Sequence, residues 1–235
     1  MTTKEILEKL QSLGTEQTRK TLKRHGAKDP VFGVKIEDMK KLLKGIKGNN
    51  RLAMELFNTG NYDAMYFAGL IADGSKLTAD EIRGWAGVAY GSGISEYTVP
   101  WVATENSSAP DLAKEWIESD VEQIAVSGWS TLACVVSVWP DENLDLPYLR
   151  SMLHRVETEI HQAPNRVRYT MNGFVIAVGA YVAPLHEECL AIAGSIGTVK
   201  VEMHGTACKV PVATDYILKI SKMGRTGQKR KVVKC

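Results

Sequence analysis

With 44% hydrophobic and 24% charged residues, this chain of 235 residues has the composition of a soluble globular protein with a sizeable core. Its longest apolar run, "FVIAVGAYVA" at 174–183, is too short to cross a bilayer, which needs roughly 20 residues. The four cysteines form no CxxC pair, so neither a zinc site nor a disulfide framework is expected. We therefore expect a cytoplasmic protein with no metal, no other cofactor and no membrane partner.

Helical periodicity runs through the chain from its first residues. In "KEILEKLQSL" apolar residues recur at helical intervals, and "IEDMKKLLKGI" at 36–46 places apolar residues on one face and lysines on the other. Further helices are expected at about 50–58, 61–73, 78–90, 108–119, 121–138, 145–161, 166–182, 184–195 and 209–222. No segment shows the alternation of a β-strand between hairpin turns.

The residues between these segments agree with helix starts and stops. Thr78 and Glu81 have the spacing of a capping box, and Pro110 and Pro147 stand where a helix can begin. Three glycines fall at expected helix ends: Gly60, Gly74 and Gly194. Short connections between such helices predict an all-α chain, with 1–235 as one domain of stacked helical hairpins in a HEAT-like right-handed superhelix. A compact helical bundle is the alternative.

Formal charge is distributed unevenly along the chain. The net charge is +8 from Arg19 to Arg51, −11 from Leu52 to His154 and +7 from Thr206 onward. Basic ends around an acidic middle are typical of a protein that holds a polyanion, although the segregation can also serve solubility alone. A stacked array has a concave face, so we expect a concave basic groove there. The predicted phosphate contacts are Lys35, Lys40, Lys41, Lys44, Lys47, Lys229, Arg230 and Lys231.

Several segments, in their order and spacing, carry a resemblance to a known family. They are "VFGVKIEDMKKLLKGI" at 31–46, "WIESDVEQIAVSGWSTLACVV" at 116–136, "NRVRYTMNGFVIAVGAYV" at 165–182, "HGTACKVPVATDYILKI" at 204–220 and the basic tail "GQKRKVVKC" at 227–235. Together they resemble the DNA alkylation repair family of HEAT-repeat DNA glycosylases, the last two a particular branch of it. The resemblance implies a DNA-binding protein.

Enzymes of that family excise N3- and N7-alkylated purines, and a carboxylate stabilises the oxocarbenium-like transition state. The resemblance aligns Trp129 with a tryptophan of the DNA cleft and Arg168 with the family's arginine, with Arg166 as a further cleft candidate. It also places Ser130 and Ala133 where the family has two aspartates, Ala133 at the catalytic one. Alanine cannot stabilise a cation, so the resemblance predicts a cleft without its catalyst. Without the resemblance, a tryptophan on an apolar helix is typical of a core residue.

Three functions remain open at this point. The first is a monomeric, DNA-binding member of the family that recognises damaged or structured (branched, nicked or bent) double-stranded DNA through phosphate contacts, with weak or no base excision. The second is an active alkylpurine glycosylase that releases 3-methyladenine or 7-methylguanine with another acid, for which the candidates are Glu105, Asp111, Glu115 and Asp120. The third is a HEAT-like scaffold that binds protein through its acidic middle.

Overall fold

The computed structural model describes residues 1–234, and every regular element in that range is a helix. The chain divides into two compact units. Unit 1 comprises Met1–Ser108 and Met203–Ala207, and unit 2 comprises Ala109–Glu202 and the segment from Cys208 onward. The all-α prediction is therefore confirmed, whereas the single domain over 1–235 and the basic groove stay predictions.

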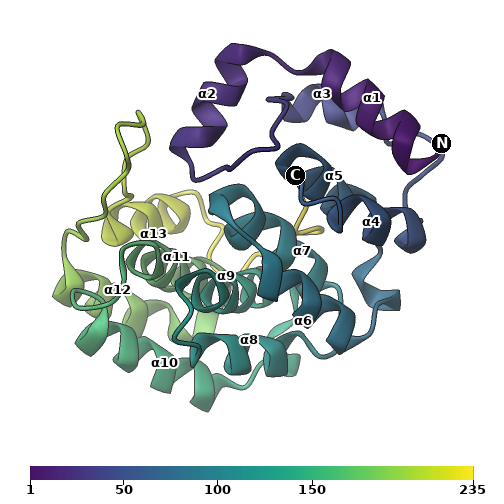
Figure 1. Ribbon diagram of the computed structural model, residues 1–235. Helices are drawn as coiled ribbons and strands as arrows, with labels where there is room; N and C mark the ends of the chain where they lie inside the picture. Colours follow the sequence, from purple (N-terminus) through teal and green to yellow (C-terminus); the bar gives the residue numbers. More distant parts are fainter. Residues whose placement is uncertain (235) are drawn as a thin grey trace. The chain divides into compact units, whose positions relative to one another are not determined.

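Unit 1 is built around one helix that is buried on every side. Each residue of α5 (Tyr62–Ile71) is buried, and α5 packs against α4 (Asn50–Phe57) and against the π-helical turn η2 (Gly93–Thr98) (Figure 1). The other elements are α1 (Thr3–Leu13), α2 (Glu16–Arg24), α3 (Ile36–Lys41), η1 (Gly74–Lys76), α6 (Ala79–Val88) and α7 (Val99–Thr104). The predicted capping box at the start of α6 is confirmed, because Thr78 and Glu81 bond each other's backbone N–H groups.

Unit 2 consists of two layers of helices (Figure 1). One layer holds α8 (Ala109–Ile117), α10 (Leu146–Glu159) and α12 (His186–Ile196), and the other holds α9 (Glu122–Val138), α11 (Asn165–Tyr181) and α13 (Ala213–Lys222). The long helices α9 and α11 pack along each other, and α11 also packs on α12 and α13. Two short 3-10 helices, η3 (Asp141–Asn143) and η4 (Ala183–Leu185), lie in the connections. One apolar core runs through both layers, from Ala113 to Ile217.

The predicted helices differ from the observed ones at a few places. The helix predicted over 36–46 ends at Lys41, and the chain then turns through Gly45, whose positive φ of 79° is not helical. Gly194 lies inside α12, which ends instead at Ile196 with Gly197 as its C-cap. The sequence did not predict α2, because that helix is strongly polar and has no buried residue.

No single helix among residues 1–234 is both long and apolar enough for a membrane span. The pair Asn165–Tyr181 and Ala183–Ile196 satisfies length and composition only when the two helices are taken together, and it is bent by 114°.

Candidate nucleic-acid interface

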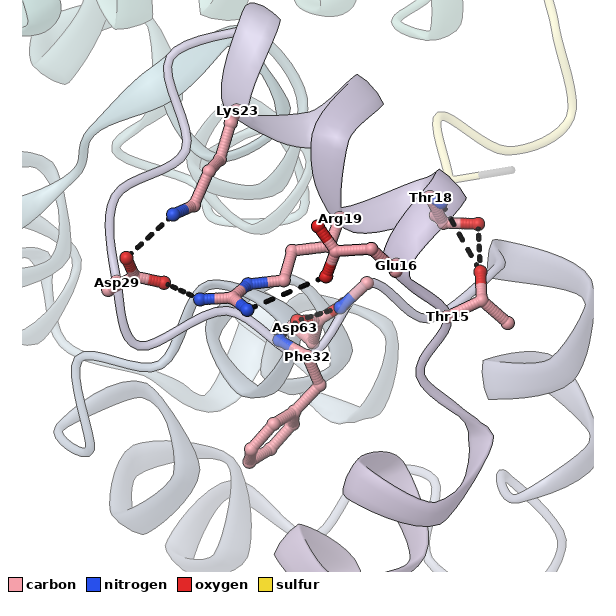
Figure 2. A network of polar contacts seen from close by, with 9 residues as sticks. Thr15, Glu16, Thr18, Arg19, Lys23, Asp29, Phe32 and Asp63 are labelled. Carbon is pink, nitrogen blue, oxygen red and sulfur yellow. Dashed lines mark hydrogen bonds and ion pairs between the residues drawn. The ribbon is translucent and has the colours of Figure 1, made fainter.

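A buried carboxylate in unit 1 fixes the loop that leads into the lysine-rich α3. Asp63, on α5, is fully buried and accepts a hydrogen bond from the backbone N–H of Phe32 at 2.6 Å (Figure 2). It also accepts from the backbone N–H groups of Gly33 at 3.1 Å and Val34 at 2.8 Å. Three converging N–H groups form a concave site for an anion, and here the protein's own carboxylate fills it. Asp63 is not among the residues predicted from the sequence, although a single acid inside the apolar run "NYDAMYFAGLI" is a signal for such a buried partner.

Two cations of α2 are neutralised within the protein. Asp29 lies between Lys23 and Arg19, with N–O distances of 2.6 and 2.7 Å (Figure 2). The hydrogen bonds from Lys23 and Arg19 lower the pKa of the Asp29 carboxyl from its ordinary value. These two cations are therefore less available to a phosphate than the net charge of this segment implies.

The predicted phosphate-binding lysines of unit 1 fall into two groups. All five are exposed, but Lys41 pairs with Asp38 at 2.6 Å, and Lys35 lies 4.0 Å from Glu37. The pairing with Asp38 raises the pKa of the Lys41 ammonium group. Within residues 1–234, no ion pair involves the other three, which are Lys40, Lys44 and Lys47. Those three are the stronger candidates for phosphate contacts.

In unit 2, Trp129 lies in the apolar core at the centre of α9. Only 2% of the residue is exposed, and its ring packs at 5.4 Å, centroid to centroid, from the ring of Phe174 on α11. A ring this buried offers almost no face on which a DNA base could stack. The structure thus gives Trp129 a packing role, and its predicted role in a DNA cleft stays a prediction.

A pocket of about 490 Å³ reaches the buried Trp129 from the surface of unit 2. Trp129, Val167 and Met171 form part of its apolar wall, and Arg155 in its rim pairs with Glu118 and Glu159. The carboxylates that line it are Glu118, Asp120, Glu122 and Glu159. A pocket with this excess of acids repels a phosphate backbone. Among the four acids named as possible replacements for the catalytic aspartate, Asp120 alone lines this pocket.

The residues that the resemblance places at the family's two aspartate positions carry no charge. Ser130 is buried and Ala133 is half-buried, and both lie on α9 close to Trp129 in sequence. Neither can act as a base or stabilise a cationic sugar. The α9 helix therefore presents no carboxylate where the resemblance places the catalytic one.

The two arginines at the start of α11 are held differently. The Arg166 guanidinium lies 4.4 Å from the centre of the Tyr169 ring, and its backbone N–H donates to Glu122 at 2.7 Å. Arg168 is half-buried; its Nη2 makes only a long contact of 3.4 Å with Asn165, and its Nε has no hydrogen-bond partner within residues 1–234. That Nε is buried and offers no donor to a phosphate oxygen at the surface, so the predicted role of Arg168 in the cleft stays a prediction.

The basic tail is fixed on unit 2. The N–H of Gly227 donates to Ala180, and the N–H of Arg230 donates to Ser137, at 2.9 and 2.8 Å. The ammonium of Lys229 lies 2.6 Å from a carboxylate oxygen of Asp141 and donates to the Val136 carbonyl at 2.9 Å. Lys229 is therefore a structural anchor, whereas Arg230 and Lys231 are exposed.

Comparisons with known proteins agree with this geometry. The family model described as DNA alkylation repair enzyme matches residues 6–197. Two uncharacterized proteins, one of Listeria monocytogenes and one of Listeria innocua, are each 34% identical over 216 residues, or 89% of this chain and 93% of the relative. A solved structure matches with a TM-score of 0.91 and 37% identity over all of both chains. It is described as belonging to "a new family of proteins related to the HEAT-like repeat DNA glycosylases with affinity for branched DNA structures". The HEAT-like fold predicted from the sequence is thereby confirmed.

Proposed function

This chain belongs to the DNA alkylation repair enzyme family, and from that premise we propose that it binds branched DNA with weak or no base excision. The observation that carries the proposal is the match, over the whole of both chains, to a protein described by its affinity for branched DNA. That match includes α13 and the basic tail, which lie beyond the residues 6–197 that the family model covers. The proposal thus rests on the complete chain and not on the family alone.

The chemistry of α9 supports binding over excision. A negative charge near the sugar speeds glycosidic cleavage of an alkylated purine, and Ala133 supplies none. The pocket that reaches Trp129 is instead lined by four acids and by Arg155, which pairs with two of them. We expect double-stranded DNA to be held at the surface cations, among them Lys40, Lys44, Lys47 and Arg168, and to be recognised by its shape.

We also propose that the protein is a monomer and acts in the cytoplasm. Its three described cysteines, Cys134, Cys189 and Cys208, are free thiols, which supports a reducing compartment. A single peak at the mass of one chain in size-exclusion chromatography with light scattering is the expected result. A dimer at micromolar concentration would contradict this part.

The test is a fluorescence-anisotropy titration of the protein with a three-way junction, a nicked duplex and a linear duplex of equal length. We expect at least tenfold tighter binding to the junction, and binding to all three DNAs that weakens steeply between 50 and 200 mM salt. Equal affinity for the junction and the linear duplex would overturn the proposal.

A second candidate function, alkylpurine excision, is favoured by one observation: Asp120 shares a pocket with Trp129. We expect no release of 7-methylguanine or 3-methyladenine above background when the protein is incubated with dimethyl sulfate-treated DNA. Release that is abolished in Asp120→Asn but retained in Glu115→Gln, a matched acid on α8 outside the pocket, would instead support a glycosylase that uses a different acid.

A further inference from the structure

The helix α13 is held in unit 2 by its buried face and by hydrogen bonds of the segments before and after it. Ala213 and Ile217 are fully buried, and Ile217 comes so close to α11 that a Cβ added to Gly179 would lie 2.7 Å from its Cδ1. Asn172 on α11 donates to the Pro211 carbonyl just before the helix, at 2.9 Å. After the helix, Gly227 bonds back to Ala180. The orientation of α13 is thus fixed by one face and by its flanking segments.

A second face of α13, beside the buried one, is largely apolar but exposed. Val212, Tyr216, Lys219 and Met223 follow one another at intervals of four, three and four residues, so they lie along one side of the helix. Val212 is 36% exposed, Tyr216 51% and Met223 52%. Neither a ring contact nor a hydrogen bond of the Tyr216 side chain occurs within residues 1–234. We call these four residues the α13 stripe.

The stripe and the residues around it carry cations without ion-pair partners. Within residues 1–234, no ion pair involves Lys209, Lys219, Lys222 or Arg225, and the single acid of the helix is Asp215 at its first turn. This excess of positive charge repels a second copy of the same surface and attracts a polyanion. An exposed aromatic ring among unpaired cations is the combination that binds nucleic acid with unstacked bases, because the ring takes a base and the cations take phosphates.

We propose that the α13 stripe is the part of the protein that recognises the branch, with Tyr216 stacked on an unpaired or terminal base at the branch point and Lys219 and Lys222 on the flanking phosphates. This inference rests on the proposed binding of branched DNA and names the residues that distinguish a branch from a linear duplex. Away from its two ends, a linear duplex offers phosphates but no open base face, so Tyr216 contributes far more to binding of the branch than to binding of the duplex.

The test compares the full-length protein with Tyr216→Ala, Tyr216→Phe and Leu218→Ala in anisotropy titrations. Leu218 is the matched control, because it is 42% exposed on the same helix and lies outside the stripe. The DNAs are a three-way junction with two unpaired bases at the branch and a linear duplex. We expect Tyr216→Ala to bind the junction about tenfold more weakly and the duplex unchanged within twofold, with Tyr216→Phe and Leu218→Ala equal to wild type.

A fluorescent base gives a second readout. An unpaired 2-aminopurine at the branch is expected to lose fluorescence on binding to the wild type and to Tyr216→Phe, but not to Tyr216→Ala. The double variant Lys219→Gln, Lys222→Gln is expected to bind both DNAs more weakly and to lower the slope of log affinity against log salt by about 2.

The outcomes separate this inference from the proposed function. If wild type prefers the junction and Tyr216→Ala binds it equally well with the same quenching, the role of the stripe is wrong and branch binding stands. If wild type shows no preference for the junction, the proposed function fails, and the inference fails with it. A protein partner that is retained by wild type after nuclease treatment and lost in Tyr216→Ala would also overturn the inference.

Discussion

The two basic regions of the chain carry similar net charge but differ in how much of it the protein has already neutralised. In the first basic region, residues 19–51, five cations have carboxylate partners within 4.0 Å: Arg19, Lys23, Lys35, Lys41 and Arg51. In the second basic region, residues 206–234, Lys229 is ion-paired, whereas none of the four cations on and near α13 is. Net charge therefore overstates the first region as a binding surface, because paired cations attract phosphates less than free ones.

The largest expected effect is a loss of folding stability in the first basic region when its buried carboxylate is removed. Asp63→Ala removes the acceptor of three N–H groups in the loop before α3 and leaves them without a partner. We expect the free energy of unfolding to fall by about 3 kcal/mol, and Asp63→Asn, which keeps one oxygen acceptor, to lose about half of that. Urea denaturation followed by circular dichroism measures both. A loss below about 1 kcal/mol in Asp63→Ala would show that water replaces the carboxylate.

The next largest effect is a loss of DNA affinity, which is compared between variants that remove unpaired cations and variants that remove paired ones. The triple variant Lys40→Gln, Lys44→Gln, Lys47→Gln removes unpaired cations, and we expect DNA affinity to fall about thirtyfold and the salt slope by 2 to 3. The matched control removes the same charge from paired cations of this region, as Lys35→Gln, Lys41→Gln, Arg51→Gln. A loss of less than fivefold is expected there in the same anisotropy assay. Equal losses in the two triple variants would show that total charge decides, and not pairing.

A smaller effect concerns Lys229 in the second basic region. Its side chain is only 18% exposed, and Asp141 and the Val136 carbonyl already occupy its ammonium group. We expect Lys229→Met to lower the free energy of unfolding by about 1.5 kcal/mol and to leave DNA affinity within twofold of wild type. Lys231→Met, at an exposed neighbour, is the control and is expected to leave stability unchanged. The prediction fails if Lys229→Met binds DNA markedly more weakly while its stability is intact.

The smallest effect is an expected absence of reaction. Cys189 is buried in unit 2, and burial raises the pKa of its thiol to about 12, so at pH 8 almost none of it is thiolate. Cys208, at the start of the second basic region, is exposed. We expect iodoacetamide at pH 8 to modify Cys208 within minutes and to leave Cys189 unmodified in the native protein, as measured by peptide mass spectrometry. Modification of Cys189 at a similar rate would show that unit 2 opens.

Much of the fold could be predicted from local patterns. The nine helices expected from residue 50 onward all occur, because an apolar face repeating every three to four residues fixes a helix wherever a core covers it. Two features were not predicted. The helix α2 has no buried residue, so its sequence shows no apolar periodicity. The end of α3 depends on glycine turns inside a lysine-rich segment. The segment that forms η2 and α7, "GISEYTVPWVAT", mixes apolar residues with polar ones such as Glu96 and has no periodic pattern.

Some properties of the candidate site follow from the sequence, and others depend on the tertiary structure. The sequence by itself determined the family and the basic ends of the chain, because each of these depends on which residue stands at which position. That Ser130 and Ala133 stand where the family has aspartates stays a prediction. Only the tertiary structure decided which cations are free, that Lys229 is an anchor, that Trp129 is buried against Phe174, and that Tyr216 faces solvent on a fixed helix. These properties come from partners far apart in the chain, such as Lys229 and Asp141, whose proximity no spacing in the sequence encodes.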